Sequence, residues 1–403
     1  ALTLGLGACA DSTAPRDGAA VPRRPLTAAE ASPVRASNTF AFDLLREVGA
    51  EAEHRGKNLV LSPYSGSAAL GMAANGAAGE TLAGMQRALG LSGTLAESNA
   101  TFRALTDYLL GADSRVTVRT ANSVWAAEGF PVRPEFSAAV GQFFGAEART
   151  VRFGTPEATA AINAWASAKT EGMIPKVFDP GAPDANTVAL LMNALYFKGQ
   201  WAARFEAART APRPFTLPNG TAASVPTMTR DRAPLWVGGD GNVEVGELPY
   251  GNGAYAMTVV LPPRGADVEA FAAALTPARW DVLVGTLREA TQQVALPRFA
   301  LKGESAWNGP LARLGMDAAF SPARADFTGL SATCGCFISL VKQNIDLRVD
   351  EEGTTAAAVT SVVMEVTSAP PAFVVDRPFV FAVRERASGA ILFLGRVLDP
   401  RQP

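Results

Sequence analysis

Few residues in this sequence have the types and spacing that enzymatic chemistry needs. His54 is the only histidine among 403 residues. A Ser-His-Asp hydrolase would have to use it, and metal sites with two histidines are excluded. His54 stands in a polar stretch at a predicted helix end, which indicates a surface residue rather than a ligand. Three cysteines are too few for a four-thiolate zinc site, so no metal is expected.

The other candidates for chemistry are typical of loops. Glu351 and Glu352 are adjacent carboxylates, but neighbouring residues on a strand point to opposite faces, so they are interpreted as solvated loop charges. Glycine clusters at 238–241 and 251–253 lack the strand-to-helix setting of a dinucleotide site and are interpreted as turns. No GxxxxGK[ST] loop occurs. The sequence therefore favours a protein that is not an enzyme and holds no cofactor.

Composition also limits the partners. Hydrophobic residues make up 48% and charged residues 18% of the chain, as in a folded globular protein. Lys and Arg number 36 against 38 Asp and Glu, which gives a net charge of −2. Without a basic excess, nucleic acid is not an expected partner.

The first residues match the end of a bacterial lipoprotein signal. Residues 6–9 read Leu-Gly-Ala-Cys, a pattern cut just before the cysteine, so residues 1–9 are interpreted as a signal remnant. Cys9 would then carry lipid and tether the protein to a membrane outside the cytoplasm. An ordinary secretory signal or a chance match is the alternative. Residues 10–36 lack hydrophobic periodicity and are predicted to form a flexible linker.

Cys334 and Cys336 form a second cysteine feature. An oxidising location permits a disulfide between them, although residues two apart on an extended strand lie near the upper limit of Cα separation for one. A bridge and a pair of free thiols both stay open.

Helical and strand patterns mix from residue 37 to the end without a dividing linker, which predicts one α+β domain over 37–403. Apolar residues between 40 and 48 share a helical face, with Ser37 or Asn38 as the expected N-cap. The Ala- and Gly-rich stretch 65–75 predicts a helix lying close to a sheet. Strands are predicted at 187–197, 254–261, 293–301, 379–383 and 391–397, the last two as a hairpin.

One further segment is unusual. Residues 354–369 contain no Gly or Pro and are followed by Pro370. At a period of two, one face is small or apolar throughout, and a central strand could bury it. That face carries Thr354, Ala356, Ala358, Thr360, Val362 and Met364. An ordinary sheet strand explains the same pattern.

Nine stretches match the pattern of one protein family in the family's order. They are NLVLSPYSGSAALGMAANGAAGET (58–81), IPKVF (174–178), LMNALYFKGQW (191–201), LPYGNGAYAMTVVLPP (248–263), LPRF (296–299), GMDAAF (315–320), DFTGLS (326–331), VDEEGTTAAAVT (349–360) and DRPFVFAVRERASGAILFLGRVLDP (376–400). On these residues the chain resembles a serpin from about residue 38 to its end. The resemblance implies one domain with three β-sheets, about nine helices and an exposed reactive-centre loop at about 351–371.

The unusual segment coincides with that loop. The resemblance places the family's hinge at Glu351, Gly353, Thr354, Ala356, Ala357 and Ala358. Counted from Glu351, the family's usual spacing puts the scissile bond at Thr367–Ser368, with Val366–Thr367 as the alternative. Thr355 stands where the hinge usually carries Glu, and a small, strand-compatible residue keeps the inhibitory interpretation.

The mechanism that the resemblance implies is suicide inhibition. A serine protease attacks the carbonyl of Thr367 and forms an acyl-enzyme, and the cut loop inserts into the large sheet as a new strand. Insertion of 354–367 at about 3.3 Å per residue would carry the tethered protease roughly 45 Å. Thr367 or Val366 suits elastase-like or subtilisin-like proteases. A monomer is expected.

Further positions follow from the same resemblance. The strands of the large sheet must part beside a polar group, which corresponds to Ser62, Ser65, Asn193 and Gln343. Insertion begins beside an aromatic residue, which corresponds to Trp201. Gln343 replaces the family's usual histidine and Asn344 the next lysine; a glutamine forms hydrogen bonds but does not titrate. Core packing is the alternative role of Trp201.

Two alternative functions stay open for the whole protein: a non-inhibitory binding module and an inhibitor of cysteine proteases.

Overall fold

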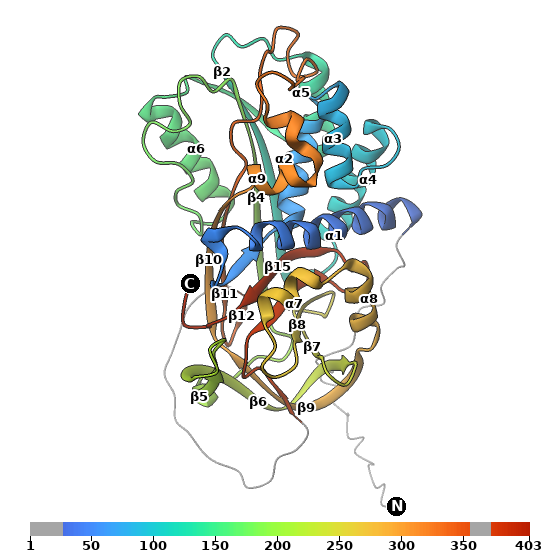
Figure 1. Cartoon of the computed structure of the whole chain (residues 1–403), viewed down its shortest axis with the longest axis vertical. Helices are drawn as coiled ribbons and strands as arrows, with labels where there is room; N and C mark the ends of the chain where they lie inside the picture. The colour runs from blue at the N-terminus through green and yellow to red at the C-terminus, as the bar shows by residue number, and fades with distance from the viewer. Residues whose placement is uncertain (1–26, 355–371) are drawn as a thin grey trace, which may run out of the picture.

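The computed structural model describes residues 27–354 and 372–403 (Figure 1). Their nine α-helices are α1 (Ala28–Gly49), α2 (Pro63–Ala74), α3 (Gly79–Leu89), α4 (Leu95–Leu110), α5 (Pro134–Phe144), α6 (Pro156–Lys169), α7 (Val268–Ala274), α8 (Pro277–Gly285) and α9 (Asn308–Leu311). Four shorter helical turns are η1 (Ala52–His54), η2 (Ala207–Arg209), η3 (Ala312–Met316) and η4 (Asp317–Phe320). None of the helices in these two ranges is long and apolar enough to cross a membrane.

Six strands form the sheet that carries the candidate site, in the order β10-β11-β12-β4-β2-β3. They are β2 (Val116–Ala127), β3 (Glu147–Val151), β4 (Ala189–Gln200), β10 (Phe299–Ala306), β11 (Lys342–Val349) and β12 (Gly353–Thr354). The strand predicted at 187–197 is β4, which pairs antiparallel with β2 along its length. A nearly continuous apolar sequence suits this central place, since helices pack on it.

The second sheet has nine strands in the order β1-β15-β14-β8-β7-β6-β9-β13, with β5 also on β6. They are β1 (Leu59–Leu61), β5 (Ala211–Thr216), β6 (Ala222–Gly239), β7 (Glu244–Pro249), β8 (Tyr255–Leu261), β9 (Arg288–Pro297), β13 (Ala372–Val374), β14 (Phe379–Glu385) and β15 (Ile391–Val397). The predicted strand 254–261 is β8, and the predicted hairpin is β14 and β15, which pair antiparallel.

The family resemblance implied three sheets, whereas the described residues form two hydrogen-bonded sheets, and the long strand β6 explains the difference. Its first half pairs with β5 and its second half with β7, so two of the expected sheets are continuous through it. A bulge between Arg230 and Ala233 separates the halves, and a bulge bends the strand that carries it. The strand predicted at 293–301 is likewise divided, because the chain passes from one sheet to the other at Arg298. The α+β fold is confirmed.

Helix α2 lies close to the six-stranded sheet, as its small residues predict. Ser62 caps it by accepting a hydrogen bond from the backbone N–H of Ser65 at 3.4 Å, and Pro63 occupies the first turn. A Cβ at Gly66 would lie 2.5 Å from the ring of buried Trp307. Glycine is therefore required there for the close approach.

The predicted boundary of the N-terminal linker is wrong. Helix α1 begins at Ala28, so 28–36 is helical, and Ser37 and Asn38 lie inside the helix rather than capping it. The side chain of Asn38 instead donates to the carbonyl of Gly389 at 2.9 Å and accepts from the N–H of Ile391. Burial of Val34 against the body extends the helix beyond the periodic stretch that the sequence shows. Residues 10–26 and Cys9 lie outside the described residues.

The surface position predicted for His54 is also wrong. His54 closes η1, is 9% exposed, and its carbonyl accepts a hydrogen bond from Arg396 at 2.8 Å. Burial lowers the pKa of His54 from its ordinary value, and neighbouring Arg396 acts in the same direction. The polar sequence around it gave no sign of this burial, which the distant strand β15 supplies.

Cys334 and Cys336 lie in the segment that leads to β11. Their sulfur atoms are paired, with the Cα atoms 5.0 Å apart. This separation lies within the range that disulfides span.

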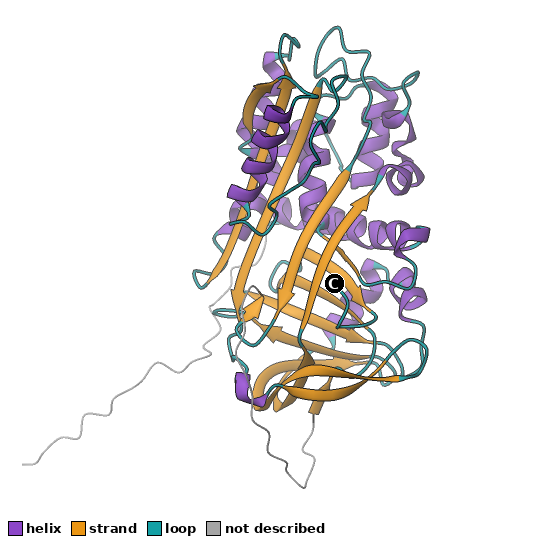
Figure 2. Ribbon diagram, turned by 90° about the vertical axis from the view of Figure 1, so that its left-hand side faces the viewer, coloured by secondary structure: helices purple, strands orange, loops and turns teal. Residues whose placement is uncertain are grey.

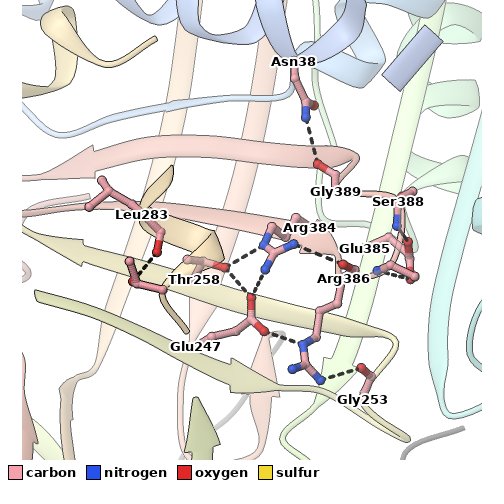
Figure 3. Close-up of polar contacts among 12 residues, drawn as sticks. Asn38, Glu247, Gly253, Thr258, Leu283, Arg384, Glu385, Arg386, Ser388 and Gly389 are labelled. Atoms are coloured by element: carbon pink, nitrogen blue, oxygen red, sulfur yellow. Dashed lines mark hydrogen bonds and ion pairs between the residues drawn. The ribbon is translucent and has the colours of Figure 1, made fainter. Parts of the chain in front are cut away.

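A buried charge network joins β7, β8 and β14 (Figure 3). Glu247 on β7 is 1% exposed and contacts the guanidinium groups of Arg384 and Arg386. Thr258 on β8 donates to Glu247 and accepts from Arg384, both at 3.0 Å. Burial alone would raise the pKa of Glu247, but the two guanidinium groups hold that pKa below its ordinary value. Arg386 also lies 3.8 Å over the ring of Trp236.

Replacing Arg384 tests the weight of this network. Arg384→Met should lower the free energy of unfolding by about 3–5 kcal/mol, because Glu247 keeps a buried charge with one cation fewer. The measurement is urea unfolding of the intact protein. The control Arg103→Met removes an exposed helical pair with Asp107 and should cost at most about 1 kcal/mol. Equal losses for the two variants would contradict the argument.

Candidate functional site

The six-stranded sheet is parted between β4 and β11. Strand β12, only Gly353 and Thr354, lies between them: Thr354 pairs with Val349 of β11 and with Gly199 of β4. Beyond these two residues the described parts of β4 and β11 share no register with each other. Figure 2 shows the two groups of long strands diverging from this end of the sheet.

A cavity of about 690 Å³ continues from the end of β12 between the parted strands. Its walls are β4 and β11, helix α2 borders one side, and α6 with the segment after it borders the other. Thr354 is among the residues that line it. The backbone groups along the facing edges of β4 and β11 are the natural partners of an added strand.

Gln343 fastens β11 to the start of α2. Its side-chain oxygen accepts from the N–H of Ser62 at 2.8 Å, and its side-chain nitrogen donates to the carbonyl of Ser62 at 2.9 Å. The Ser62 hydroxyl donates to the carbonyl of Leu392 on β15 at 2.9 Å. A glutamine satisfies both backbone groups of one residue at once, which explains how it serves where histidine was expected from the family.

Asn193 forms the matching contact on β4. Its side-chain oxygen accepts from the Ser65 hydroxyl, and its nitrogen donates to Thr120 at 2.9 Å and to Asn122 at 2.8 Å on β2. Ser62, Ser65, Asn193 and Gln343, called the polar cluster below, are therefore joined by hydrogen bonds at the place where the family resemblance put them. The sequence reasoning missed Thr120 and Asn122, whose spacing in β2 carries no distinctive motif.

The hinge begins with a buried carboxylate rather than a solvated one. The side chain of Glu351 is 8% exposed and contacts Arg298, and the Thr210 hydroxyl donates to it at 2.5 Å. Burial alone would raise the pKa of Glu351, but these two hydrogen bonds leave that pKa below its ordinary value. The sequence prediction holds better for Glu352, whose side chain is 49% exposed and pairs with Arg204. Thr210 and Arg298 lie far from the hinge in sequence, which hid the contact.

Aromatic residues hold the next part of the hinge. Trp201 donates from its indole N–H to the carbonyl of Asp350 at 2.8 Å and stacks on Tyr250 with ring centroids 4.5 Å apart. The hydroxyl groups of Tyr250 and Thr354 lie 2.6 Å apart, and both side chains are buried. Burial of Asp350 raises the pKa of its carboxyl. Trp201 therefore contacts the start of the predicted hinge, and it is packed in the core as well.

Comparisons with known proteins assign the family. The model of the family described as "Serpin (serine protease inhibitor)" matches residues 35–400. A Leukocyte elastase inhibitor from Bos taurus is 35% identical over 381 residues, which cover 91% of this chain and 99% of that protein. The chain is a serpin. Iripin-2 from Ixodes ricinus, another relative, is 35% identical over 378 residues, 91% of this chain and 94% of that protein.

Solved serpin structures share the architecture. The thermophilic serpin Tengpin in its native state superposes with a TM-score of 0.81 at 27% identity, over 95% of this chain and 97% of that one. Protease nexin-1 with heparin gives 0.81 at 25% identity, over 92% of this chain and all of that one. The predicted hinge residues Ala356, Ala357 and Ala358 and the predicted bond Thr367–Ser368 lie outside the described residues of this serpin.

A double-mutant cycle tests the contact between Tyr250 and Thr354. Tyr250→Phe removes the hydroxyl that meets Thr354, and with Thr354→Val it should give a coupling of about 1 kcal/mol in urea unfolding. Tyr64 and Thr106 form a matched pair at 2.7 Å between α2 and α4, away from the hinge. Tyr64→Phe should cost a similar amount of stability. A coupling near zero between Tyr250 and Thr354 would contradict the contact.

Proposed function

We propose that this serpin inhibits serine proteases by the suicide route, with residues after Thr354 entering the cavity between β4 and β11. The observation that carries the proposal is the place of β12. Its two residues already occupy the first positions of a strand between β11 and β4, at the head of the cavity. An inserted strand would extend the pairing that Gly353 and Thr354 already form with β4 and β11.

The register of β12 supports a position for each later residue of the proposed strand. Extending the pairs Thr354–Gly199 and Thr354–Val349 by one residue at a time brings Thr360 opposite Asn193 on β4 and Gln343 on β11. Both of those side chains point toward α2, as Thr354 points into the core. Because side chains alternate along a strand, the face of small residues that begins with Thr354 would be buried. The hydroxyl of Thr360 on that face would reach the polar cluster.

Relatives and sequence support the protease class. Leukocyte elastase inhibitors from Bos taurus, Sus scrofa, Mus musculus and Rattus norvegicus are among the similar proteins. Thr367 and Val366 are small or medium side chains without charge. We infer cleavage by elastase-like or subtilisin-like enzymes, because an acidic primary pocket, which binds a cationic side chain, would find none at this bond.

A hinge variant tests the route. Thr354→Arg places a charge where the side chain is 2% exposed, so insertion should slow and the variant should be cleaved as a substrate. Thr355→Arg is the matched control, because its side chain would lie on the opposite face. The measurements are the SDS-resistant adduct with subtilisin, its mass and the number of inhibitor molecules used per protease inactivated. Wild type should form the adduct, and Thr355→Arg should form nearly as much of it. Thr354→Arg should form at least tenfold less adduct than wild type. Clean cleavage of wild type with full recovery of protease would reject the proposal.

The polar cluster gives a second test, in the pH dependence of insertion. Gln343 does not titrate, so the insertion rate of wild type should vary little between about pH 5.5 and 7.5. Gln343→His should introduce a transition in the insertion rate near pH 6.5. The imidazole would keep only one of the two hydrogen bonds with the Ser62 backbone, and it becomes charged as the pH falls. His54→Gln in both backgrounds removes the one natural histidine. A clear transition near pH 6.5 in the His54→Gln protein would contradict this role for Gln343.

A further inference from the structure

A cluster of arginines lies beside the points where the chain enters and leaves segment 355–371. We define the arginine face as all charged residues of 204–232 together with residues 298, 351 and 352. Its cations are Arg204, Arg209, Arg213, Arg230, Arg232 and Arg298, and its anions are Glu206, Asp231, Glu351 and Glu352. The face has two cations more than anions, whereas the whole chain has a net charge of −2.

Contacts join this face to the residues that precede the segment. Arg204 lies 3.0 Å from the carboxylate of Glu352, and Arg230 donates to the backbone carbonyl of Arg204. Arg298 contacts Glu351 on the same side. The arginine face therefore begins at the hinge.

Other contacts join the face to the residues that follow the segment. Asp231 contacts Arg209 and accepts from the side chain of Gln293 at 2.9 Å. Gln293 pairs in β9 with Ala372, the first described residue after the segment. The proposed scissile bond lies between these two ends, so a protease that reaches the bond must approach this end of the molecule, at the foot of Figure 1.

The bulge in β6 directs one cation outward. Asp231 and Arg232 together oppose the single residue Gln293, and Arg232 has φ of 52°, in a region that side-chain-bearing residues rarely occupy. Arg232 is exposed, and so is Arg213 on the neighbouring strand β5. Neither forms a salt bridge with a residue in the described ranges, although the charge of Arg213 helps to lower the pKa of Asp231.

We propose that the arginine face is a docking surface for the target protease and favours proteases whose surface around the active-site cleft is acidic. This inference rests on the inhibitory function proposed above and adds the charge of the partner to it. Complementary charge acts chiefly on the rate of encounter, through steering that salt screens. The residues of segment 355–371 then determine which bond is cleaved, and the arginine face determines how fast the protease is captured.

Surface charge on the protease can be changed while its cleft stays the same. The probes are subtilisin and succinylated subtilisin, whose surface lysines become carboxylates. The variant is Arg213→Ala/Arg232→Gly, since glycine accepts the positive φ. The control is Arg133→Glu at the start of α5, the opposite end of the molecule in Figure 1, with the same change in net charge. Second-order inhibition rates are measured at low and high salt.

Wild type and Arg133→Glu should inhibit succinylated subtilisin about three- to tenfold faster than subtilisin at low salt, and about equally at 1 M salt. The double variant should lose this advantage while its adduct yield stays that of wild type. Equal advantages in the double variant and in Arg133→Glu would overturn the proposal. So would an effect of the double variant on heparin binding alone, since the face would then serve a polyanion. Failure of wild type to form any adduct would instead reject the inhibitory function.

Discussion

The parting of β4 and β11 is the constraint on which the rest of this structure depends. Backbone N–H and C=O groups inside a protein are almost always paired, so facing strand edges inside one sheet favour a strand between them. The two residues of β12 pair with both strands at one end of the gap only. The cavity below has the length, the edges and the polar cluster that a longer strand would use. This arrangement supports the proposal that a further strand enters the sheet here.

Several contacts hold the residues that precede the predicted insertion. The Tyr250 hydroxyl meets that of Thr354, Trp201 donates to the carbonyl of Asp350, and Glu351 contacts Arg298 and Thr210. Hydrogen bonds of this kind contribute about 1 kcal/mol each, whereas a full inserted strand would form roughly a dozen ladder bonds. The hinge contacts keep the first residues in register without competing seriously with extension. They act as a starting point for the strand.

The sequence predicted several sheet strands, because apolar runs such as β4 are local signals, whereas the polar cluster came only from the family resemblance. It missed what distant residues supply. Val34 is buried by the body of the protein, which extends α1, and His54 is covered by residues of β15. Glu351 looked solvated because its partners, Thr210 and Arg298, lie elsewhere in the chain. Tertiary burial, rather than local pattern, decided each of these positions.

Encounter and insertion depend on different physics. Steering by exposed arginines weakens within a Debye length of about 10 Å at 0.1 M salt. Insertion instead exchanges buried contacts around a polar cluster whose central amide, on Gln343, carries no charge. In the proposed mechanism, insertion after acylation decides whether a captured protease is trapped or released. Ionic strength should then change the rate of inhibition and leave the yield of adduct per cleavage unchanged. The two proposed functions use different parts of the fold: the exposed arginine face serves encounter, and the polar cluster inside the sheet serves insertion. Each can therefore change without the other.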